Sequence, residues 1–218
     1  MILALVPAFN EEKKIAAVVR TLLAKVNEVV VIDDGSDDAT AQEAALAGAT
    51  VLVHALNRGQ GAALETGHQY AREQNAEIIV HFDADGQFDP NDVGRGLVAL
   101  QETGVDIVLG SRFLEKKSEL PWLKRHLVLP FGRLVDRFFG GVRLTDAHNG
   151  FRVLNKHALS VLCLTQDRMA HATEIPQLIA RHQLSYAELP ITVSYHEFGQ
   201  GPLAGLRVLR DLVWKKLL

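Results

Sequence analysis

Short apolar runs alternate with longer amphipathic stretches over the first half of the chain. Short apolar runs bounded by polar residues are typical of buried strands, whereas apolar residues recurring every three or four positions are typical of helices. The predicted strands cover residues 2–6, 29–32, 51–53, a run that begins at 78, and 107–109. The predicted helices begin near Glu11, near Asp37, near Gly61 and after Pro90.

This alternation predicts one α/β domain spanning residues 1–218, built on a mostly parallel, twisted sheet flanked by helices. Ligands of such folds bind at the carboxyl ends of the strands. Three polar clusters follow predicted strands, at residues 7–11, 33–36 and 83–85. We therefore expect these clusters to share one rim of the sheet, with the strand at 107–109 as the last of the series.

Two carboxylates and an amide end the fourth predicted strand. Asp83 and Asp85 alternate with Ala84, so they lean to the same side at an extended strand end. Gly86 then lets the chain turn toward Gln87. Because Mg²⁺ and Mn²⁺ are held by one or two carboxylates together with substrate phosphates, we predict a metal site at Asp83, Asp85 and Gln87. A solvated turn is the alternative.

Two adjacent acids, Asp33 and Asp34, follow the second predicted strand. A helix cap at Ser36 or Asp37 accounts for one acidic residue in this turn, but not for two. The other carboxylate is predicted to accept hydrogen bonds from a nucleobase or a ribose. Residues 57–61, with the sequence Asn-Arg-Gly-Gln-Gly, faintly resemble a phosphate-binding loop, and a plain turn is an equal alternative.

Composition places the chain among ordinary globular proteins. It has 218 residues, of which 48% are hydrophobic and 22% are charged, and a formal net charge of −3. The single cysteine, Cys163, excludes an intrachain disulfide and receives no role. Neither a signal peptide nor an apolar run of about 18 residues is evident, so we expect a cytoplasmic protein. We expect no nucleic-acid partner.

Basic and aromatic residues gather in the second half of the chain. Residues 112–143 contain eight lysines and arginines against three acids, together with Trp122, Phe131, Phe138 and Phe139. We interpret residues 113–143 as an acceptor-side segment that contacts a membrane surface or a lipid phosphate, with a solvated basic helix as the alternative. Leucines at helical spacing predict an amphipathic helix over 202–218, which docks on a membrane, on its own sheet or on a partner.

Several motifs follow one another in order: residues 7–11, residues 33–40, residues 83–90 and Gly110-Ser111-Arg112. Their succession resembles the family 2 glycosyltransferases of GT-A fold. Residues 146–152, with the sequence Asp-Ala-His-Asn-Gly-Phe-Arg, are similar to a motif of the polyprenyl-phosphate sugar transferases, the dolichol-phosphate mannose synthase group. The resemblance covers about residues 2–200. It implies a transferase that takes a sugar from a nucleotide-diphosphate sugar of the GDP-mannose or UDP-glucose type.

The resemblance also implies roles for individual residues. It places the nucleotide against Pro7, Phe9, Glu11, Ile32, Asp33, Asp34, Asp83, Ala84 and Asp85. It assigns Mg²⁺ or Mn²⁺ to Asp83, Asp85 and Gln87, and the acceptor phosphate to Arg112, Arg125 and Arg133. The candidate catalytic residues are Asp85, Arg112 and Asp146.

Two positions depart from the pattern of this group. Phe9 stands where Tyr is usual, but its ring can still stack on a base. Residues 195–201 lack the Arg, Ser and Lys that close over the diphosphate in the group, and His196, Gln200 or Arg207 are candidates to substitute for them.

The expected reaction is displacement at the anomeric carbon of the nucleotide sugar by an oxygen of a polyprenyl phosphate, with inversion. A phosphate monoester has a second pKa of about 6 and is already anionic at neutral pH, so it needs no general base. The metal stabilises the departing diphosphate, and Arg112 positions the acceptor. A hydroxyl acceptor is the alternative and requires a base, for which Asp146, Glu174 and, more weakly, His148 are candidates.

Two other functional classes compete with this interpretation. A sugar nucleotidyltransferase also uses carboxylates at strand ends, but it would have a glycine-rich basic loop where Glu11 and Glu12 stand. An impaired nucleotide-binding scaffold for a membrane partner is favoured by the missing cations and opposed by the intact Asp83, Asp85 and Gln87. We expect a peripheral enzyme of the cell envelope at the inner face of the plasma membrane, with a small membrane protein as a candidate partner.

Overall fold

The computed structural model describes residues 1–114, 142 and 144–194. The strands are β1 (Ile2–Ala8), β2 (Glu28–Asp33), β3 (Thr50–Val53), β4 (Ile78–His81), β5 (Ile107–Ser111), β6 (Arg152–Asn155) and β7 (Tyr186–Pro190). The helices are α1 (Ile15–Leu23), α2 (Thr40–Leu46), α3 (Gln60–Glu73), α4 (Asn91–Thr103), α6 (Lys156–Val161) and α7 (His171–Arg181). None of the helices in these ranges is long and apolar enough to cross a bilayer.

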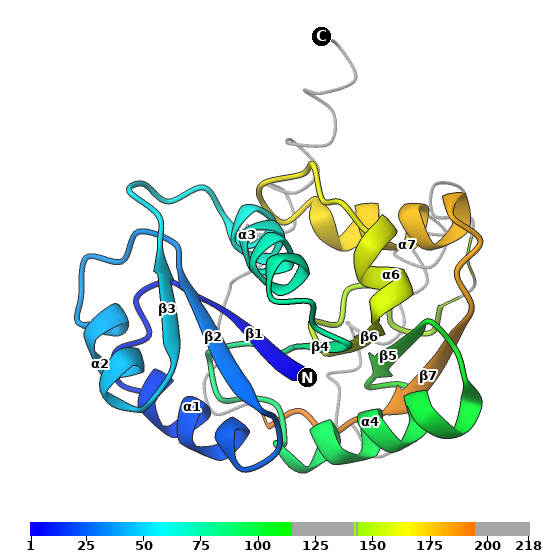
Figure 1. The fold of residues 1–218 in the computed structure, drawn as a ribbon, viewed down its shortest axis with the longest axis horizontal. Helices are drawn as coiled ribbons and strands as arrows, with labels where there is room; N and C mark the ends of the chain where they lie inside the picture. The colour runs from blue at the N-terminus through cyan, green and yellow to red at the C-terminus, as the bar shows by residue number, and fades with distance from the viewer. Residues whose placement is uncertain (115–141, 143, 195–218) are drawn as a thin grey trace, which may run out of the picture.

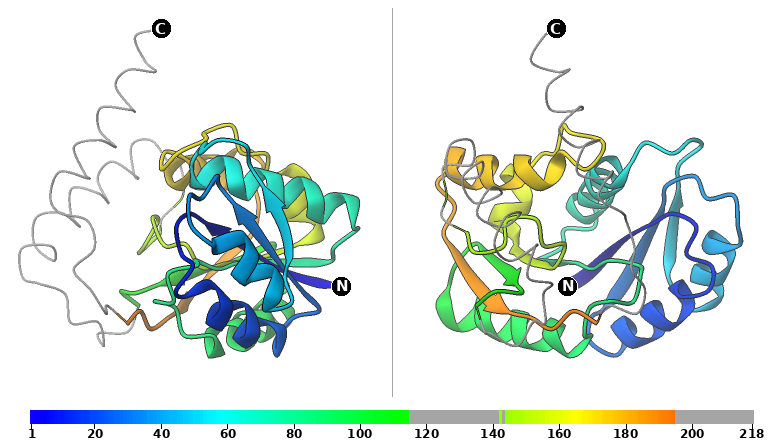
Figure 2. Two further views of the ribbon diagram at one scale, coloured as in Figure 1. Left: turned by 90° about the vertical axis from the view of Figure 1, so that its left-hand side faces the viewer. Right: turned by 180° about the vertical axis from the view of Figure 1, so that it is seen from behind.

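The strands form one sheet, which within the described ranges has seven members in the order β3-β2-β1-β4-β6-β5-β7. Helices α1, α2 and α4 cover one face, and α3, α6 and α7 cover the other, as Figures 1 and 2 show. Four of its six strand pairs are parallel, and β6 runs antiparallel to both of its neighbours. The predicted α/β class and the mostly parallel sheet are confirmed.

Burial on both faces explains why β1 and β2 appear as continuous apolar runs in the sequence. Along β1, Leu3 and Leu5 pack toward α3, while Ala4 and Val6 pack toward α1, and all four side chains are fully buried. A strand covered on both sides has no polar face, so its sequence does not alternate. The predicted strands correspond to β1 through β5.

The sheet does not end with β5, so the expectation that the strand at 107–109 is the last of the series was wrong. β6 lies between β4 and β5, and β7 pairs with the outer side of β5. β6 has only four residues and starts with the charged Arg152, while β7 includes Glu188 and Pro190. Neither segment carries the apolar run on which the prediction relied, because tertiary pairing, rather than local pattern, decides that these residues are strands.

The predicted cap at Ser36 or Asp37 was also wrong, because α2 begins at Thr40 and its N-cap residue is Ala39. The polar groups before it bridge two loops instead. Asn10 N–H donates to Ser36 Oγ over 2.9 Å, and Asp37 N–H donates to Asn10 Oδ1 over 3.0 Å. These bonds join the loop after β1 to the loop after β2 at the carboxyl rim of the sheet.

Candidate functional site

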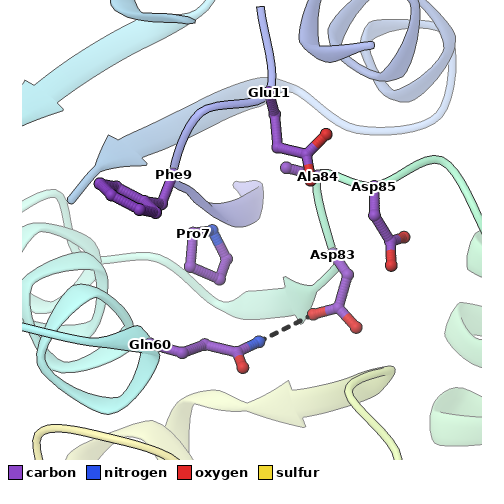
Figure 3. Close-up of a pocket in the computed structure, with 7 residues that line it drawn as sticks. All are labelled: Pro7, Phe9, Glu11, Gln60, Asp83, Ala84 and Asp85. Atoms are coloured by element: carbon purple, nitrogen blue, oxygen red, sulfur yellow. Dashed lines mark hydrogen bonds between the residues drawn. The ribbon is translucent and has the colours of Figure 1, made fainter. Parts of the chain in front are cut away.

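A pocket of about 180 Å³ opens at this rim, between the ends of β1 and β4 and the start of α3. Its described lining consists of Pro7, Phe9, Glu11, Gln60, Asp83, Ala84 and Asp85, which Figure 3 shows. Six of these seven were predicted to bind nucleotide, and Gln60 was not. Because pockets for small ligands usually exceed about 300 Å³, the described residues form only part of a site for a nucleotide sugar.

Phe9 and Glu11 form the side of the pocket that follows β1. Phe9 is 45% exposed, so its ring offers an apolar face at the mouth of the pocket. Burial raises the pKa of Glu11; Lys14 opposes this and the nearby Asp85 adds to it. The carboxylates that follow β1 and β4 therefore repel one another, which favours a cation in this part of the site.

Asp83 is the most constrained carboxylate of the pocket. Gln60 Nε2 donates a hydrogen bond of 2.9 Å to Asp83 Oδ1. Burial and then the charge of Asp85 raise the pKa of Asp83 to about 6, while Arg152 and Arg112 act against this shift. At neutral pH the group is mostly ionised, but at a cost that a bound cation would relieve.

Asp85 and Gln87 are joined through the backbone. Gln87 N–H donates to Asp85 Oδ1 over 2.9 Å, across the turn at Gly86, which has a φ of +70°. Of the three predicted metal ligands, Asp83 and Asp85 line the described pocket and Gln87 does not.

The donor set suits a hard divalent cation whose remaining ligands come from a substrate. Among the described residues, no group of three or more acidic, histidine or cysteine side chains is arranged to hold a metal. Mg²⁺ and Mn²⁺ do not need such a cage, since one or two carboxylates combine with substrate phosphates and water. Asp83 and Asp85 fit that pattern.

An aromatic cluster supports the turn that carries these carboxylates. Phe82, Phe88 and Phe151 pack edge to face, with ring centroids 5.5 to 6.4 Å apart. All three side chains are buried. The turn between Phe82 and Phe88 is therefore anchored at both ends in the core, which limits how far Asp83 and Asp85 can move.

Asp34 is engaged in building a neighbouring turn. Its carboxylate accepts hydrogen bonds from the backbone N–H groups of Arg58 (2.9 Å) and Gly59 (2.6 Å), and it contacts His54 Nδ1 at 2.7 Å. Asp33 is likewise bonded to Ser36. Both acids are only 3% exposed, Ile32 is fully buried, and none of the three lines the described pocket. Their predicted nucleotide contacts stay predictions.

The turn held by Asp34 consists of residues 57–61, the segment whose sequence faintly resembles a phosphate-binding loop. Gly59 has a φ of +104°, a conformation that favours glycine, and α3 starts at the next residue. A side chain on Gly61 would lie 1.9 Å from Gln166 O, so the second glycine allows the loop at 165–168 to pack directly on the helix start. Ala62 N–H donates to Asp167 O over 2.9 Å.

Arg112 and Asp146 form a second charged centre. Arg112 Nε lies 2.7 Å from Asp146 Oδ2, and Nη2 lies 2.8 Å from Oδ1, which is a bidentate arrangement. The Asp146 side chain is 3% exposed and that of Arg112 is 26% exposed. Both oxygens of Asp146 thus accept bonds from the guanidinium, so the carboxylate orients Arg112 instead of standing open as a base.

Residues 150–152 join this ion pair to the carboxylates. A side chain on Gly150 would approach Asp83 Oδ2 to 2.3 Å, so the loop backbone lies directly against that carboxylate. Arg152 is buried, lies close enough to Asp83 to lower its pKa, and donates to Gly150 O over 3.4 Å. Burial lowers the pKa of Arg152 to about 10, against the opposing effect of Asp83 and Asp146, so the group stays cationic at neutral pH.

The other candidate bases have different environments. Glu174 is buried and accepts hydrogen bonds from Thr165 N–H (3.0 Å) and Gln166 N–H (2.9 Å), so it holds the loop that packs on α3. His148 is exposed. Arg125, Arg133, residues 195–201, the helix predicted at 202–218 and nearly all of the segment 113–143 lie outside the described residues.

Sequence reasoning missed three residues of this site: Gln60, Gly150 and Arg152. The two closely spaced glycines at 59 and 61 were a usable signal, since they indicated a tight turn that presents the residue between them. Gly150 and Arg152 were included only as part of the motif at residues 146–152, without a role of their own. No local pattern indicates that a glycine 67 positions further along the chain touches Asp83, because β6 brings it there.

Comparison with known proteins identifies the family to which this chain belongs. Residues 4–163 match the family described as glycosyl transferase family 2. An uncharacterized protein of Methanocaldococcus jannaschii is 35% identical over 99% of this chain and 92% of its own length. The UDP-N-acetylglucosamine–dolichyl-phosphate N-acetylglucosaminyltransferase of Methanococcus voltae is 29% identical, over 100% of this chain and 96% of its own.

Two further matches extend the comparison. The polyprenol monophosphomannose synthase of Mycolicibacterium smegmatis is 29% identical over 98% of this chain and 84% of its own. The crystal structure of glucosyl-3-phosphoglycerate synthase from Mycobacterium tuberculosis, in complex with Mg²⁺ and uridine diphosphate, superimposes with a TM-score of 0.70 at 21% identity. That alignment covers 94% of this chain and 74% of the other, and it shows that the fold is shared.

Proposed function

The chain belongs to the family 2 glycosyltransferases of GT-A fold, and from this premise we propose that it transfers a sugar from a nucleotide-diphosphate sugar to a polyprenyl phosphate. The observation that carries the proposal is that one loop lies against both charged centres. Gly150 abuts Asp83, and the loop that contains it also supplies Asp146 to orient Arg112. A carboxylate pair suited to a metal–diphosphate and a guanidinium suited to a second phosphate therefore share one loop.

The donor would bind at the pocket described above. Phe9 offers an exposed ring for stacking on a base, and Asp83 and Asp85 would hold Mg²⁺ or Mn²⁺ together with the diphosphate. When bound, the metal supplies positive charge that stabilises the leaving diphosphate. The chain's own contribution is to hold its two carboxylates in place before the substrate arrives, since their turn is anchored in the aromatic cluster.

The acceptor would be held by Arg112. A polyprenyl phosphate is anionic at neutral pH and needs a cation to offset its repulsion from the carboxylates and the diphosphate, but no general base. Asp146 fixes the guanidinium with two short contacts while Arg112 remains partly exposed. Attack by the phosphate oxygen on the anomeric carbon then inverts its configuration. Arg125 and Arg133 are proposed to assist, and they lie outside the described residues.

The bonding of the acids favours a phosphate over a hydroxyl acceptor. A hydroxyl would require a base, and both acidic candidates are engaged elsewhere, Asp146 with Arg112 and Glu174 with the backbone of Thr165 and Gln166. Membership of a glycosyltransferase family also sets aside the sugar nucleotidyltransferase. The impaired scaffold remains as a distinct outcome of the experiment below.

We place the reaction at a membrane surface because the acceptor is a membrane lipid. The basic and aromatic segment 113–143 and the amphipathic segment 202–218 are the proposed contacts, at the inner face of the plasma membrane. A small membrane protein is the proposed partner for handling the lipid-linked product.

Sugar transfer from a panel of UDP and GDP sugars to polyprenyl phosphate tests the proposal. The assay is run with Mg²⁺, with Mn²⁺ and with EDTA, beside an Asp85→Ala variant. A lipid-phosphate product that needs both the metal and Asp85 supports the proposal and identifies the donor. Nucleotide binding without product on any lipid phosphate would overturn it in favour of another acceptor or of the scaffold.

A further inference from the structure

We propose that Gln60 is a positioning residue for Asp83: its side-chain amide holds the carboxylate in the orientation that receives the metal–nucleotide. The inference rests on the proposed function, because it concerns how the donor site is prepared. Gln60 lies at the start of α3, lines the pocket, and donates from Nε2 to Asp83 Oδ1 over 2.9 Å, as Figure 3 shows.

Asp83 is restrained from two sides. The amide of Gln60 holds Oδ1, and the backbone of Gly150 lies so close to Oδ2 that a Cβ there would come within 2.3 Å. A carboxylate has about four lone-pair positions, so one bond to an amide leaves others for a cation. A lysine at position 60 would compete with the metal by its charge, whereas the neutral amide orients the carboxylate without neutralising it.

Gln60 follows a turn that is held on two sides. The buried Asp34 accepts the N–H groups of Arg58 and Gly59, and Gly59 adopts a φ of +104°. On the other side, Gly61 is packed against Gln166 O, and Ala62 N–H bonds to Asp167 O. The first residue of α3 is thus fixed between two structures, and its side chain points to the carboxylate. This arrangement favours a positional role over a solvent-exposed glutamine that happens to meet a neighbour.

The test replaces the amide with an apolar chain of similar length, Gln60→Met. The matched control is Gln69→Met on the same helix, where the side chain is exposed. Binding of Mn²⁺ is measured by electron paramagnetic resonance with UDP and with GDP as probes. The kinetics of sugar transfer are also measured, so that kcat and the KM for polyprenyl phosphate are determined separately.

Loss of one hydrogen bond to a charged group predicts roughly tenfold weaker Mn²⁺–nucleotide binding in Gln60→Met. Gln69→Met should bind Mn²⁺ and nucleotide as the wild type does. We expect kcat to fall while KM for the lipid phosphate is unchanged, because Arg112 is untouched. Equal Mn²⁺ binding by wild type and Gln60→Met overturns the inference. Absence of Mn²⁺–nucleotide binding in the wild type overturns the proposed function instead, so the two failures are distinguishable.

A second variant guards against misfolding of the first. Gln60→Asn keeps the amide but shortens the side chain by one methylene, so it cannot span the distance to Asp83 without backbone movement. It should weaken Mn²⁺–nucleotide binding as Gln60→Met does. Wild-type affinity in Gln60→Asn would overturn the inference as well.

Discussion

The carboxylates at the end of β4 and the ion pair between Arg112 and Asp146 use charge in opposite ways. Asp83 and Asp85 have like charges at one strand end, and burial with mutual repulsion raises the pKa of Asp83 to about 6. Asp146 is more deeply buried, but a bidentate guanidinium compensates its charge. The described residues compensate the charge of the first region only in part, which fits the proposed cation site. The charge of the second region is compensated, and that ion pair holds Arg112 in place.

The largest effect should come from removing one charge of the first region. Asp85→Asn keeps the shape of the side chain but not the charge, so transfer should fall about 100- to 1000-fold, the usual effect of losing a preorganised electrostatic group. The measurement is product formation from radiolabelled nucleotide sugar. Asp37→Asn, an exposed acid near the same rim, is the control and should retain full activity. Equal losses in the two variants would contradict a special role for Asp85.

Breaking the ion pair between Arg112 and Asp146 should reduce stability as well as activity. Arg112→Met leaves Asp146 buried without its guanidinium, which should lower the free energy of unfolding by about 3 kcal/mol. Arg58→Met is the matched control, since the pair of Arg58 and Asp167 is 3.5 Å long and more than half exposed on both sides. That variant should lose less than about 1 kcal/mol. Urea unfolding of the three proteins checks both values, and similar midpoints would refute the distinction.

Acidification tests the buried His171, which lies near Arg152. Burial, together with the nearby Arg152, His148 and His68, lowers the pKa of His171 to about 4, below its value of 6.5 in an unfolded chain. The folded state therefore binds fewer protons, and stability should fall as the pH drops from about 6.5 toward 4.

The expected loss from His171 alone is about 2 kcal/mol by pH 5. His81, whose pKa is also lowered by burial and by the nearby cations, should add to the slope. His171→Gln should reduce the slope of unfolding free energy against pH without abolishing it. An unchanged slope would show that His171 does not titrate in this window.

The smallest effect should come from disturbing the loop at Gly150, which lies against Asp83 and also carries Asp146. Gly150→Ala places a methyl group against Asp83 and should weaken Mn²⁺–nucleotide binding about fivefold, or roughly 1 kcal/mol. The control is Gly94→Ala in α4, where the new Cβ meets open space. That variant should bind normally and gain about 0.5 to 1 kcal/mol of stability from helix propensity. Isothermal titration with Mn²⁺ and UDP or GDP compares the two.

Prediction from the sequence succeeded where a local pattern was sufficient. The strands β1 to β5 were apolar enough to be recognised, and the polar groups at the ends of β1 and β4 indeed line one pocket. It failed for β6 and β7, whose residues become strands only by pairing with β4 and β5. The predicted helix cap at Ser36 or Asp37 failed because the polar groups of these residues bridge to the loop after β1.

The order of short apolar strands and amphipathic helices, by itself, determined the α/β class and the rim at which the polar groups gather. It also determined that the carboxylates at positions 83 and 85 follow the end of a strand at that rim. These features depend on the period of the backbone and on the direction of parallel strands, which neighbouring residues specify. Tertiary structure alone decided that Asp34 builds a turn, that Gln60 holds Asp83, and that Gly150 touches it. Those contacts join residues 23 to 67 positions apart, and only the packing of the sheet brings such residues together.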